Sequence, residues 1–444
     1  MPSINEPLAQ LGKKLFFSKA LGGDLDSACA SCHHPMLGGG DALSVSIGVG
    51  AHDQDLLGSA RTHPEGPTVP RNAQSTFNVA FYNQVLFYDG RIENLGKTLS
   101  LKGSDDHGTD GLQQGIRTPD SLFGEADPEA GADLIAAQSR FPVTSQDEMR
   151  GFEFEAHRPP GYARRHLAAR LGDYDAGRGE LERTGWLAEF RSAFRNSSDA
   201  RSLINETNIA AALSAYQRSQ VLVDTPWRAY VQGNEDAITQ SSKRGALLFF
   251  QSDDDGGAGC TTCHSGDFFT DEQFHVLALP QVGPGKEDGR FHDDFGRFRE
   301  SGKPVDLYAF RTPTLLNVEV TGPYGHDGAY ATLKGIVQHH LNPALAVAVY
   351  DVTELDPAVQ TQYLAFNTQR ALSKLEENRK AGLPAIQNIK LTDQQVNDIT
   401  SFLLTLTDPC VKSLACLTPW IPSDDDIDPD GLRLKARMLT SVAR

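Results

Sequence analysis

Residues 29–33 read CASCH and residues 260–264 read CTTCH. Both match C-x-x-C-H, the pattern that attaches a c-type haem: two thiols form thioethers with the haem vinyl groups, and the histidine that follows binds the iron. A structural zinc site usually has its cysteine pairs much closer together, and a thioredoxin-like motif needs only one C-x-x-C. We therefore predict two covalently bound haems c with these residues as attachment points and proximal ligands: Cys29, Cys32, His33, Cys260, Cys263 and His264.

A similar stretch precedes each pentad. Residues 11–28 read LGKKLFFSKALGGDLDSA and residues 244–259 read RGALLFFQSDDDGGAG. Each predicts a helix that ends in Leu-Phe-Phe, followed by a loop rich in Gly or Asp. The repeat predicts a mainly α fold with little β and long loops, built from two cytochrome-c-like helical domains that each carry one covalent haem.

We place the N-terminal domain at 1–223, with a long inserted loop at about 98–137 that is rich in Gly, Asp and Pro. The C-terminal domain spans 224–409, and a tail follows at 410–444. Thr392 with Gln395 predicts a capping box for a helix near the end of the second domain. Cys410 and Cys416 have no adjacent histidine, so a disulfide that pins the tail is the simplest interpretation.

The composition is ordinary for a globular chain, with 444 residues, 39% of them apolar and 22% charged. A net charge of −17 argues against nucleic acid as a partner. No apolar run reaches the length of a membrane span. The first residues lack the features of a signal peptide. Because covalent haem implies export, we expect a signal peptide that is absent from this sequence and a periplasmic protein.

The second haem iron needs a sixth ligand, and methionine is not available nearby. The chain has four methionines, Met1, Met36, Met149 and Met438. Histidines remain, above all in residues 329–340, AYATLKGIVQHH. Helical spacing puts His340 at the end of the apolar stripe that begins at Leu333, and turns His339 about 100° away. We favour His340 as the ligand, with His339 as the alternative.

Several longer motifs resemble the bacterial di-haem cytochrome c peroxidase superfamily, which includes the MauG type of methylamine utilisation. They cover most of the chain, from about residue 11 to residue 409. The matching stretches are LGKKLFFSKALGGD with CASCH, then RNAQSTFNVAF at 71–81, FYDGR at 87–91, PVTSQDEMRG at 142–151 and RTPTLLNVEVTGPYGHDG at 311–328.

The resemblance implies roles for residues around both irons. The superfamily's second haem takes its sixth ligand 14 positions after the histidine of a PY-x-H motif, which is Met in typical peroxidases and Tyr in the MauG type. Here that histidine is His326, and the position 14 further on is His340. This departure from both patterns implies a bis-histidine, low-spin, low-potential haem.

At the first haem the resemblance implies a site that reacts with hydrogen peroxide. Gln138 and Glu148 match a Gln and a Glu ten residues apart, the Glu followed by Met. A carboxylate above the iron moves a proton between the two oxygens of peroxide, and an amide orients the molecule. Classical peroxidases also carry a displaceable distal histidine in the region of His52 and His63. An open first haem is the alternative.

The resemblance implies two further features between the haems. Tyr88 stands where the family has a Trp that relays electrons, and a buried aromatic without that role is the alternative. The family also binds a calcium ion, here through Asn78, Thr321 and Pro323, whose oxygen donors suit that cation.

The resemblance implies an oxidoreductase that reduces hydrogen peroxide to water. Electrons would come from a small redox protein, a cytochrome c or a cupredoxin, through the second haem, and the family's peroxidases are often homodimers. A MauG-type oxidase that uses peroxide-derived high-valent iron to modify a protein or another large substrate is the alternative. A non-catalytic electron-transfer cytochrome is the second alternative, which Glu148 and Gln138 disfavour because a carrier needs no proton-handling groups.

Overall fold

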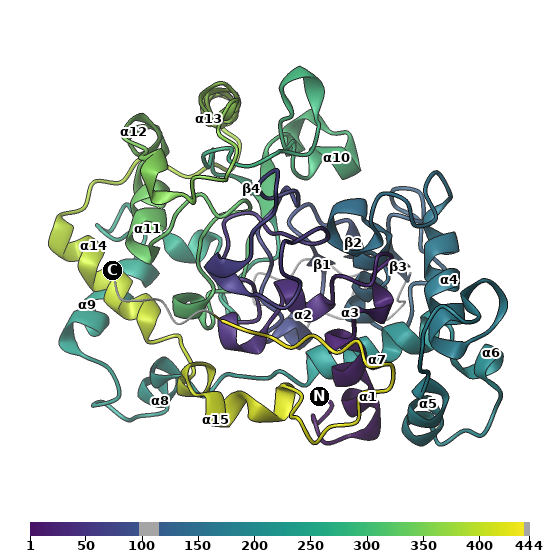
Figure 1. Ribbon diagram of the computed structural model, residues 1–444. Coiled ribbons are helices and arrows are strands. Elements are labelled where there is room, and N and C mark those ends of the chain that lie inside the picture. Colours follow the sequence, from purple (N-terminus) through teal and green to yellow (C-terminus); the bar gives the residue numbers. More distant parts are fainter. Residues whose placement is uncertain (97–114, 439–444) are drawn as a thin grey trace.

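The computed structural model describes residues 1–96 and 115–438 (Figure 1). The first part of the predicted insertion, 98–114, therefore lies outside the described residues, and 115–137 is described. The fold is mainly helical with little strand, as the sequence predicts. The helices of the first half are α1 (Pro7–Phe17), α2 (Cys29–Cys32), α3 (Leu134–Ser139), α4 (Pro160–Gly172), α5 (Trp186–Phe194), α6 (Ala200–Leu203) and α7 (Glu206–Arg218).

The second half is also built mainly from helices. Figure 1 shows this half on the opposite side of a central region of loops from the first half. Its helices are α8 (Pro226–Val231), α9 (Gln240–Phe250), α10 (Phe298–Ser301), α11 (Leu333–Leu341), α12 (Pro343–Ala348), α13 (Leu364–Lys380), α14 (Asp393–Leu404) and α15 (Leu414–Leu417). The predicted capping box begins α14, where Thr392 Oγ1 accepts the Gln395 N–H at 3.3 Å. Within the described residues, no helix is long and apolar enough to cross a membrane.

Each half contributes one small antiparallel sheet. The first has the order β1 (Val85–Leu86), β2 (Ile92–Asn94) and β3 (Ile116–Arg117), with Val85 opposite Glu93. The second pairs β4 (Phe274–Val276) with β5 (Ala309–Arg311). Ion pairs link them: Arg297 in the second half contacts Glu93 in β2 at 2.9 Å.

The sequence repeat places a glycine at the crossing of two helices in each half. Gly12 of α1 lies against α7, where an added Cβ would come 1.9 Å from the Ala212 carbonyl oxygen. Gly245 of α9 lies against α14, where the corresponding distance to the Asp398 carbonyl oxygen is also 1.9 Å. Each glycine stands three residues before the Leu of Leu-Phe-Phe. Only glycine permits these close crossings, since any side chain would push the helices apart.

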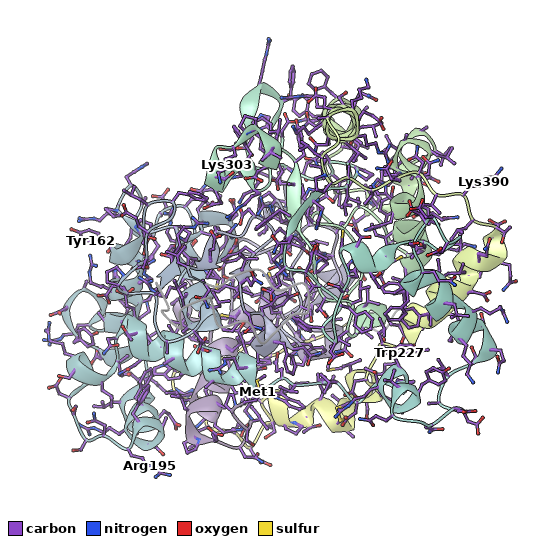
Figure 2. All side chains as sticks on the ribbon, turned by 180° about the vertical axis from the view of Figure 1, so that it is seen from behind. Met1, Tyr162, Arg195, Trp227, Lys303 and Lys390 are labelled. Atoms are coloured by element: carbon purple, nitrogen blue, oxygen red, sulfur yellow. A yellow bond between two sulfur atoms is a disulfide. The ribbon has the colours of Figure 1, made fainter. Side chains whose placement is uncertain are left out.

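Each half has its own apolar core, formed where the Leu-Phe-Phe helix meets its partner. The first core buries Leu15, Phe16, Phe17, Trp186, Phe190, Leu213 and Tyr216. The second buries Phe249, Phe269, Leu333, Ile336, Ile399 and Phe402. Burial of these side chains contributes about 1.5–3 kcal/mol each for the aliphatic and aromatic groups. Figure 2 shows side chains filling the interior, with Tyr162 and Lys390 at the periphery.

The C-terminal tail returns to the first half. Figure 1 shows it running in yellow from α14 past α15 to α1. Leu434 is buried in the first core, and its N–H donates to the Phe17 carbonyl at 2.8 Å. Asp430 accepts from Ser18 Oγ at 2.7 Å and from Trp186 Nε1 at 2.9 Å. The tail therefore belongs to the packing of the first half.

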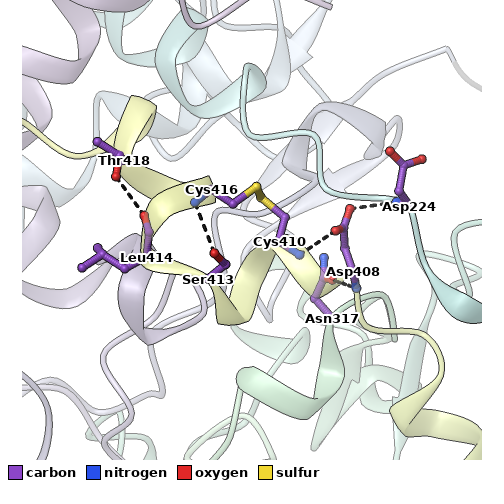
Figure 3. The surroundings of a disulfide bond; sticks show 8 residues. All are labelled: Asp224, Asn317, Asp408, Cys410, Ser413, Leu414, Cys416 and Thr418. Carbon is purple, nitrogen blue, oxygen red and sulfur yellow. Dashed lines mark hydrogen bonds between the residues drawn. A yellow bond between two sulfur atoms is a disulfide. The ribbon is translucent and has the colours of Figure 1, made fainter.

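A disulfide joins Cys410 to Cys416 at the start of this tail, with their Cα atoms 5.3 Å apart (Figure 3). Asp408 anchors the same turn: its carboxylate accepts the N–H groups of Cys410 at 2.9 Å and Asp224 at 2.8 Å. Its own N–H donates to Asn317 Oδ1 at 2.9 Å. These contacts tie the end of α14 to the segment that links the two halves.

Candidate haem and peroxide site

One continuous cavity of about 660 Å³ reaches both C-x-x-C-H pentads. The first pentad contributes Cys29, Cys32 and His33 to its lining. The second contributes Cys260, Cys263 and His264. The lining is predominantly apolar, with a few polar side chains, which is the usual chemistry of a cofactor site.

The proximal histidine of the first pentad is oriented by the backbone. His33 caps the short helix α2, and its Nδ1 lies 3.3 Å from the Gly39 carbonyl oxygen. A carbonyl can only accept, so Nδ1 carries the hydrogen and Nε2 keeps the lone pair that a metal needs. Burial lowers the pKa of His33, which keeps the imidazole neutral.

The second pentad repeats this arrangement. His264 Nδ1 donates to the Phe269 carbonyl oxygen at 3.0 Å. Burial lowers the pKa of His264 to about 4, so its ring is neutral at ordinary pH. In both pentads the backbone therefore fixes the tautomer that leaves Nε2 free for iron.

A second imidazole faces His264 across the cavity. His340, in α11, also lines the cavity, and its ring centre lies 6.4 Å from that of His264. Two metal–nitrogen bonds of ~2.0 Å, plus ~1.1 Å from each nitrogen to its ring centre, span ~6.2 Å. The His340 Nδ1–H donates to the Ile336 carbonyl at 2.8 Å, which leaves Nε2 free. The pair therefore fits a haem iron with two histidine ligands.

The neighbouring His339 is engaged elsewhere. Its Nδ1 is 2.8 Å from the Tyr330 hydroxyl and its Nε2 is 2.8 Å from the Leu277 carbonyl. With both nitrogens bonded and the residue fully buried, His339 offers no lone pair to the cavity. The side of α11 that carries His339 is buried as well, which the apolar stripe from Leu333 to His340 does not predict.

The two predicted peroxide residues lie in the same cavity as the first pentad. Gln138 is near the end of α3, and Glu148 lies in a single π-helical turn, Gln146–Arg150. Met149, which follows the glutamate, is buried with its Sδ 3.9 Å from Cys29 Sγ. Gly48 permits the close approach of this turn, because an added Cβ would lie 2.4 Å from the Glu148 carbonyl oxygen. The turn is therefore held against the first haem site.

The candidate distal histidines lie outside the cavity lining. His52 is exposed, and its Nδ1 is 3.1 Å from Thr62 Oγ1. His63 Nδ1 accepts the Glu65 N–H at 3.2 Å. The structure thus brings Gln138 and Glu148 to the first pentad without either of these histidines.

Tyr88 lines the cavity, and its hydroxyl donates to Asn72 Oδ1 at 3.5 Å. Burial raises the pKa of Tyr88, so the side chain is a neutral phenol. His326 lies near this region and stacks on Phe310, with ring centres 3.7 Å apart. All three rings line the cavity that reaches both pentads.

The predicted calcium ligands are only partly brought together. Thr321 and Pro323 line the cavity. The Asn78 amide bonds instead to the backbone of Leu222, accepting its N–H at 2.8 Å and donating to its carbonyl at 2.9 Å. Asn72 lines the cavity, and its amide is bonded as well, donating to the Leu43 carbonyl at 2.7 Å and accepting from the Tyr88 hydroxyl at 3.5 Å. Both asparagines occur in RNAQSTFNVAF, so the motif alone could not distinguish them.

A group of metal-ligating side chains lies beside the second pentad. Ligand atoms of Cys263, Asp271 and His275 all lie within 4.8 Å of one another. His275 Nε2 is 2.7 Å from Asp271 Oδ2. Because the thioether to haem uses the Cys263 sulfur, this group belongs to the haem site.

Comparisons with known proteins agree with this geometry. The family model for di-haem cytochrome c peroxidase matches residues 6–236. The chain is 28% identical over 331 residues to methylamine utilization protein MauG of Methylorubrum extorquens, covering 74% of this chain and 67% of that protein. It is 26% identical over 337 residues to cytochrome c551 peroxidase of Pseudomonas aeruginosa, covering 75% and 71%.

Among solved structures, the diheme peroxidase BthA from Burkholderia thailandensis has a similar fold. Its TM-score is 0.57 at 22% identity, over 96% of this chain and 89% of that one. The two pentads, the facing histidines and the family match lead to one conclusion. The chain belongs to the di-haem cytochrome c peroxidase family, whose members are haem c oxidoreductases that act on peroxide.

Proposed function

We propose that this protein reduces hydrogen peroxide to water at its first haem, with electrons that a small redox protein delivers through the second haem. The observation that carries the proposal is the asymmetry of the cavity. Gln138 and Glu148 accompany the first pentad, whereas His340 faces His264 at the second. One iron thus has proton-handling groups above it, and the other has two imidazoles.

The bound first haem supplies an iron that exchanges electrons with peroxide. Above it, the Glu148 carboxylate accepts the proton from the nearer peroxide oxygen and returns it to the departing oxygen. The Gln138 amide donates a hydrogen bond that orients the molecule. With two electrons and two further protons, one hydrogen peroxide gives two waters. General acid–base assistance of this kind contributes about 10²–10⁴-fold in rate.

A pair of histidines at the second iron suits electron transfer. His264 and His340 would hold the second iron between them and leave peroxide no ligand position there, and two imidazoles would give a lower potential than methionine. The donor is a cytochrome c or a cupredoxin in this proposal. The relatives that carry the name cytochrome c peroxidase support it.

A MauG-type oxidase, which modifies a large substrate, is the second candidate. The absence of His52 and His63 from the cavity lining favours it, because an open first haem reacts without prior reduction. The similarity to methylamine utilization protein MauG also supports it. Tyr88 in place of the family's Trp counts against a standard MauG relay.

Stopped-flow absorption and low-temperature EPR on the diferric protein with one equivalent of hydrogen peroxide separate these candidates. Rapid loss of a high-spin signal indicates an open first haem. Catalytic peroxide consumption with a reduced cytochrome c then supports the peroxidase, and its absence supports the oxidase. No reaction in the diferric or the half-reduced state contradicts both and leaves an electron carrier.

We also propose a periplasmic location and one calcium ion. Covalent haem and the Cys410–Cys416 disulfide support an oxidising compartment. Thr321 and Pro323 line the cavity and support the calcium site, with Asn78 as the proposed side-chain ligand and Asn72 of the same motif as the alternative. Removing calcium with a chelator and re-adding it, while following the haem spectra, tests the site.

A further inference from the structure

A lysine from the second half reaches the cavity beside the first haem site. Lys286 lies in the loop between β4 and β5, and its side chain lines the cavity. Its backbone N–H donates to the Asp293 carbonyl at 3.1 Å. Gly285 precedes it with φ +69°, and an added Cβ there would lie 1.6 Å from the His292 carbonyl oxygen. The loop therefore holds the backbone of Lys286 in one place.

Lys286 is one of three cations at this end of the cavity, together with Arg71 and Arg91. Arg71 is fully paired, with bonds to Asp294 at 2.6 and 2.8 Å and to Asp89 at 2.7 Å. Arg91 shares Asp89, at 3.0 Å. The cluster thus has three positive side chains and two carboxylates.

The Lys286 ammonium makes no ion pair with a carboxylate in residues 1–96 or 115–438. Burial, with repulsion from Arg71 and Arg91, lowers the pKa of Lys286 to about 8. Asp294 and Asp89 attract the ammonium, but their effect on its pKa is smaller than the opposing effects of burial and the two arginines. A further anion beside Lys286 would therefore stabilise the buried charge.

The haem itself carries two anions. Cys29 and Cys32 would hold a haem by its vinyl groups, and its two propionate carboxylates would lie on the edge away from these thioether bonds. The loop that carries Lys286 lies against the first half: an added Cβ at Gly283 would come 2.8 Å from Val45 Cγ1, and the next residue, Ser46, lines the cavity together with the first pentad.

We propose that the Lys286 ammonium and the Arg91 guanidinium bind the propionate carboxylates of the first haem. A loop of the second half then clamps the haem of the first half. This inference requires only that the first haem is present, so it can hold even if the protein has no peroxide turnover.

Resonance Raman and spectroelectrochemistry on the two-haem protein test the inference. Lys286→Gln and Lys286→Met should each shift the propionate bending band of the first haem and lower its midpoint potential, because a nearby positive charge favours the reduced haem. Lys286→Arg should retain both wild-type values. Lys390→Gln, at an exposed lysine at the edge of the molecule (Figure 2), is the matched control and should change neither.

Wild-type values in Lys286→Gln would overturn the role of Lys286. If Lys286→Gln fails to fold, the same two measurements on Arg91→Gln and a deuterium-oxide measurement on the wild-type protein test the clamp. A propionate held by N–H donors shifts its bending band in deuterium oxide, and a wild-type band that does not move would contradict the clamp without any variant. The midpoint potential and the band position both respond to charge. A lysine with a purely structural role would therefore not give the expected pattern, in which Lys286→Gln and Lys286→Met shift both values and Lys286→Arg keeps them.

Discussion

The imidazole rings of His264 and His340 lie 6.4 Å apart, centre to centre, on opposite sides of one cavity. His264 comes from the second pentad and His340 from α11, 76 residues later in the chain (340 − 264). The backbone carbonyls of Phe269 and Ile336 fix the two Nδ1–H groups, at 3.0 and 2.8 Å. This arrangement fits the proposed bis-histidine ligation of the second haem.

Replacing His340 should therefore change the coordination of the second haem alone. His340→Gly is expected to convert its low-spin EPR signal to high spin, because His339, the neighbouring histidine of α11, has both ring nitrogens bonded elsewhere. His340→Met should keep low spin and raise the midpoint potential. His339→Gln is the control: it breaks bonds to Tyr330 and Leu277, costs about 1–3 kcal/mol of stability, and leaves the haem spectrum unchanged. A spectral change in His339→Gln instead would reverse the assignment.

Removing the carboxylate of Glu148 should slow the reaction with peroxide. Glu148→Gln keeps the shape but cannot move a proton, so we expect the second-order rate constant to fall about 10²–10⁴-fold, with both haem spectra intact. Stopped-flow absorption measures this rate. Asp147→Asn is the matched control, since Asp147 does not line the cavity. Equal rates in the two variants would contradict the role of Glu148.

Tyr88 offers a test of electron transfer between the haems. Tyr88→Phe removes only the hydroxyl that bonds to Asn72. If Tyr88 is oxidised transiently as a relay, this variant should transfer electrons from the second to the first haem more slowly, as measured by flash photolysis of the half-reduced protein. An unchanged rate would show that the ring acts only as packing. Tyr82→Phe, at a second cavity-lining tyrosine, serves as the control.

The disulfide should contribute measurably to stability. Cys410 and Cys416 close a loop of only 6 residues in sequence separation, so the entropic gain is modest, about 2 kcal/mol. The double variant Cys410→Ser, Cys416→Ser should lower the free energy of unfolding by that amount and leave the haem spectra unchanged. Denaturant titration followed by far-UV circular dichroism provides the measurement. A reduced wild-type protein should behave like the double variant.

Asp41 predicts a specific pH dependence of stability. The residue is 1% exposed, and burial raises the pKa of its carboxyl to about 6. Between about pH 4 and 6 the folded state holds a proton that the unfolded state has released, so this group's contribution to stability is present at low pH and is lost as pH rises. Asp41→Asn should abolish that loss and be up to ~3 kcal/mol more stable at pH 7.

Denaturant unfolding at several pH values measures this difference. Asp224→Asn, at an exposed aspartate, should follow the wild-type profile within about 0.5 kcal/mol. A profile for Asp41→Asn that parallels the wild type between pH 4 and 6 would show that Asp41 stays ionised in the folded protein.

The sequence alone determined the features that depend on a few neighbouring residues. The haem pentads, the repeated Leu-Phe-Phe helices, the cap at Thr392 and the Cys410–Cys416 pair all rest on local spacing, because covalent geometry and helix periodicity fix them without the rest of the chain. Only the tertiary structure decided which side chains share the cavity. It placed His340 at the cavity while both ring nitrogens of His339 are bonded elsewhere, and it left His52 and His63 outside the cavity lining. It also packed the tail against the first core and brought Lys286 to the cavity. These features depend on packing between segments that are far apart in the sequence. Neither the burial of both faces of α11 nor the path of a long loop can be recognised from neighbouring residues alone.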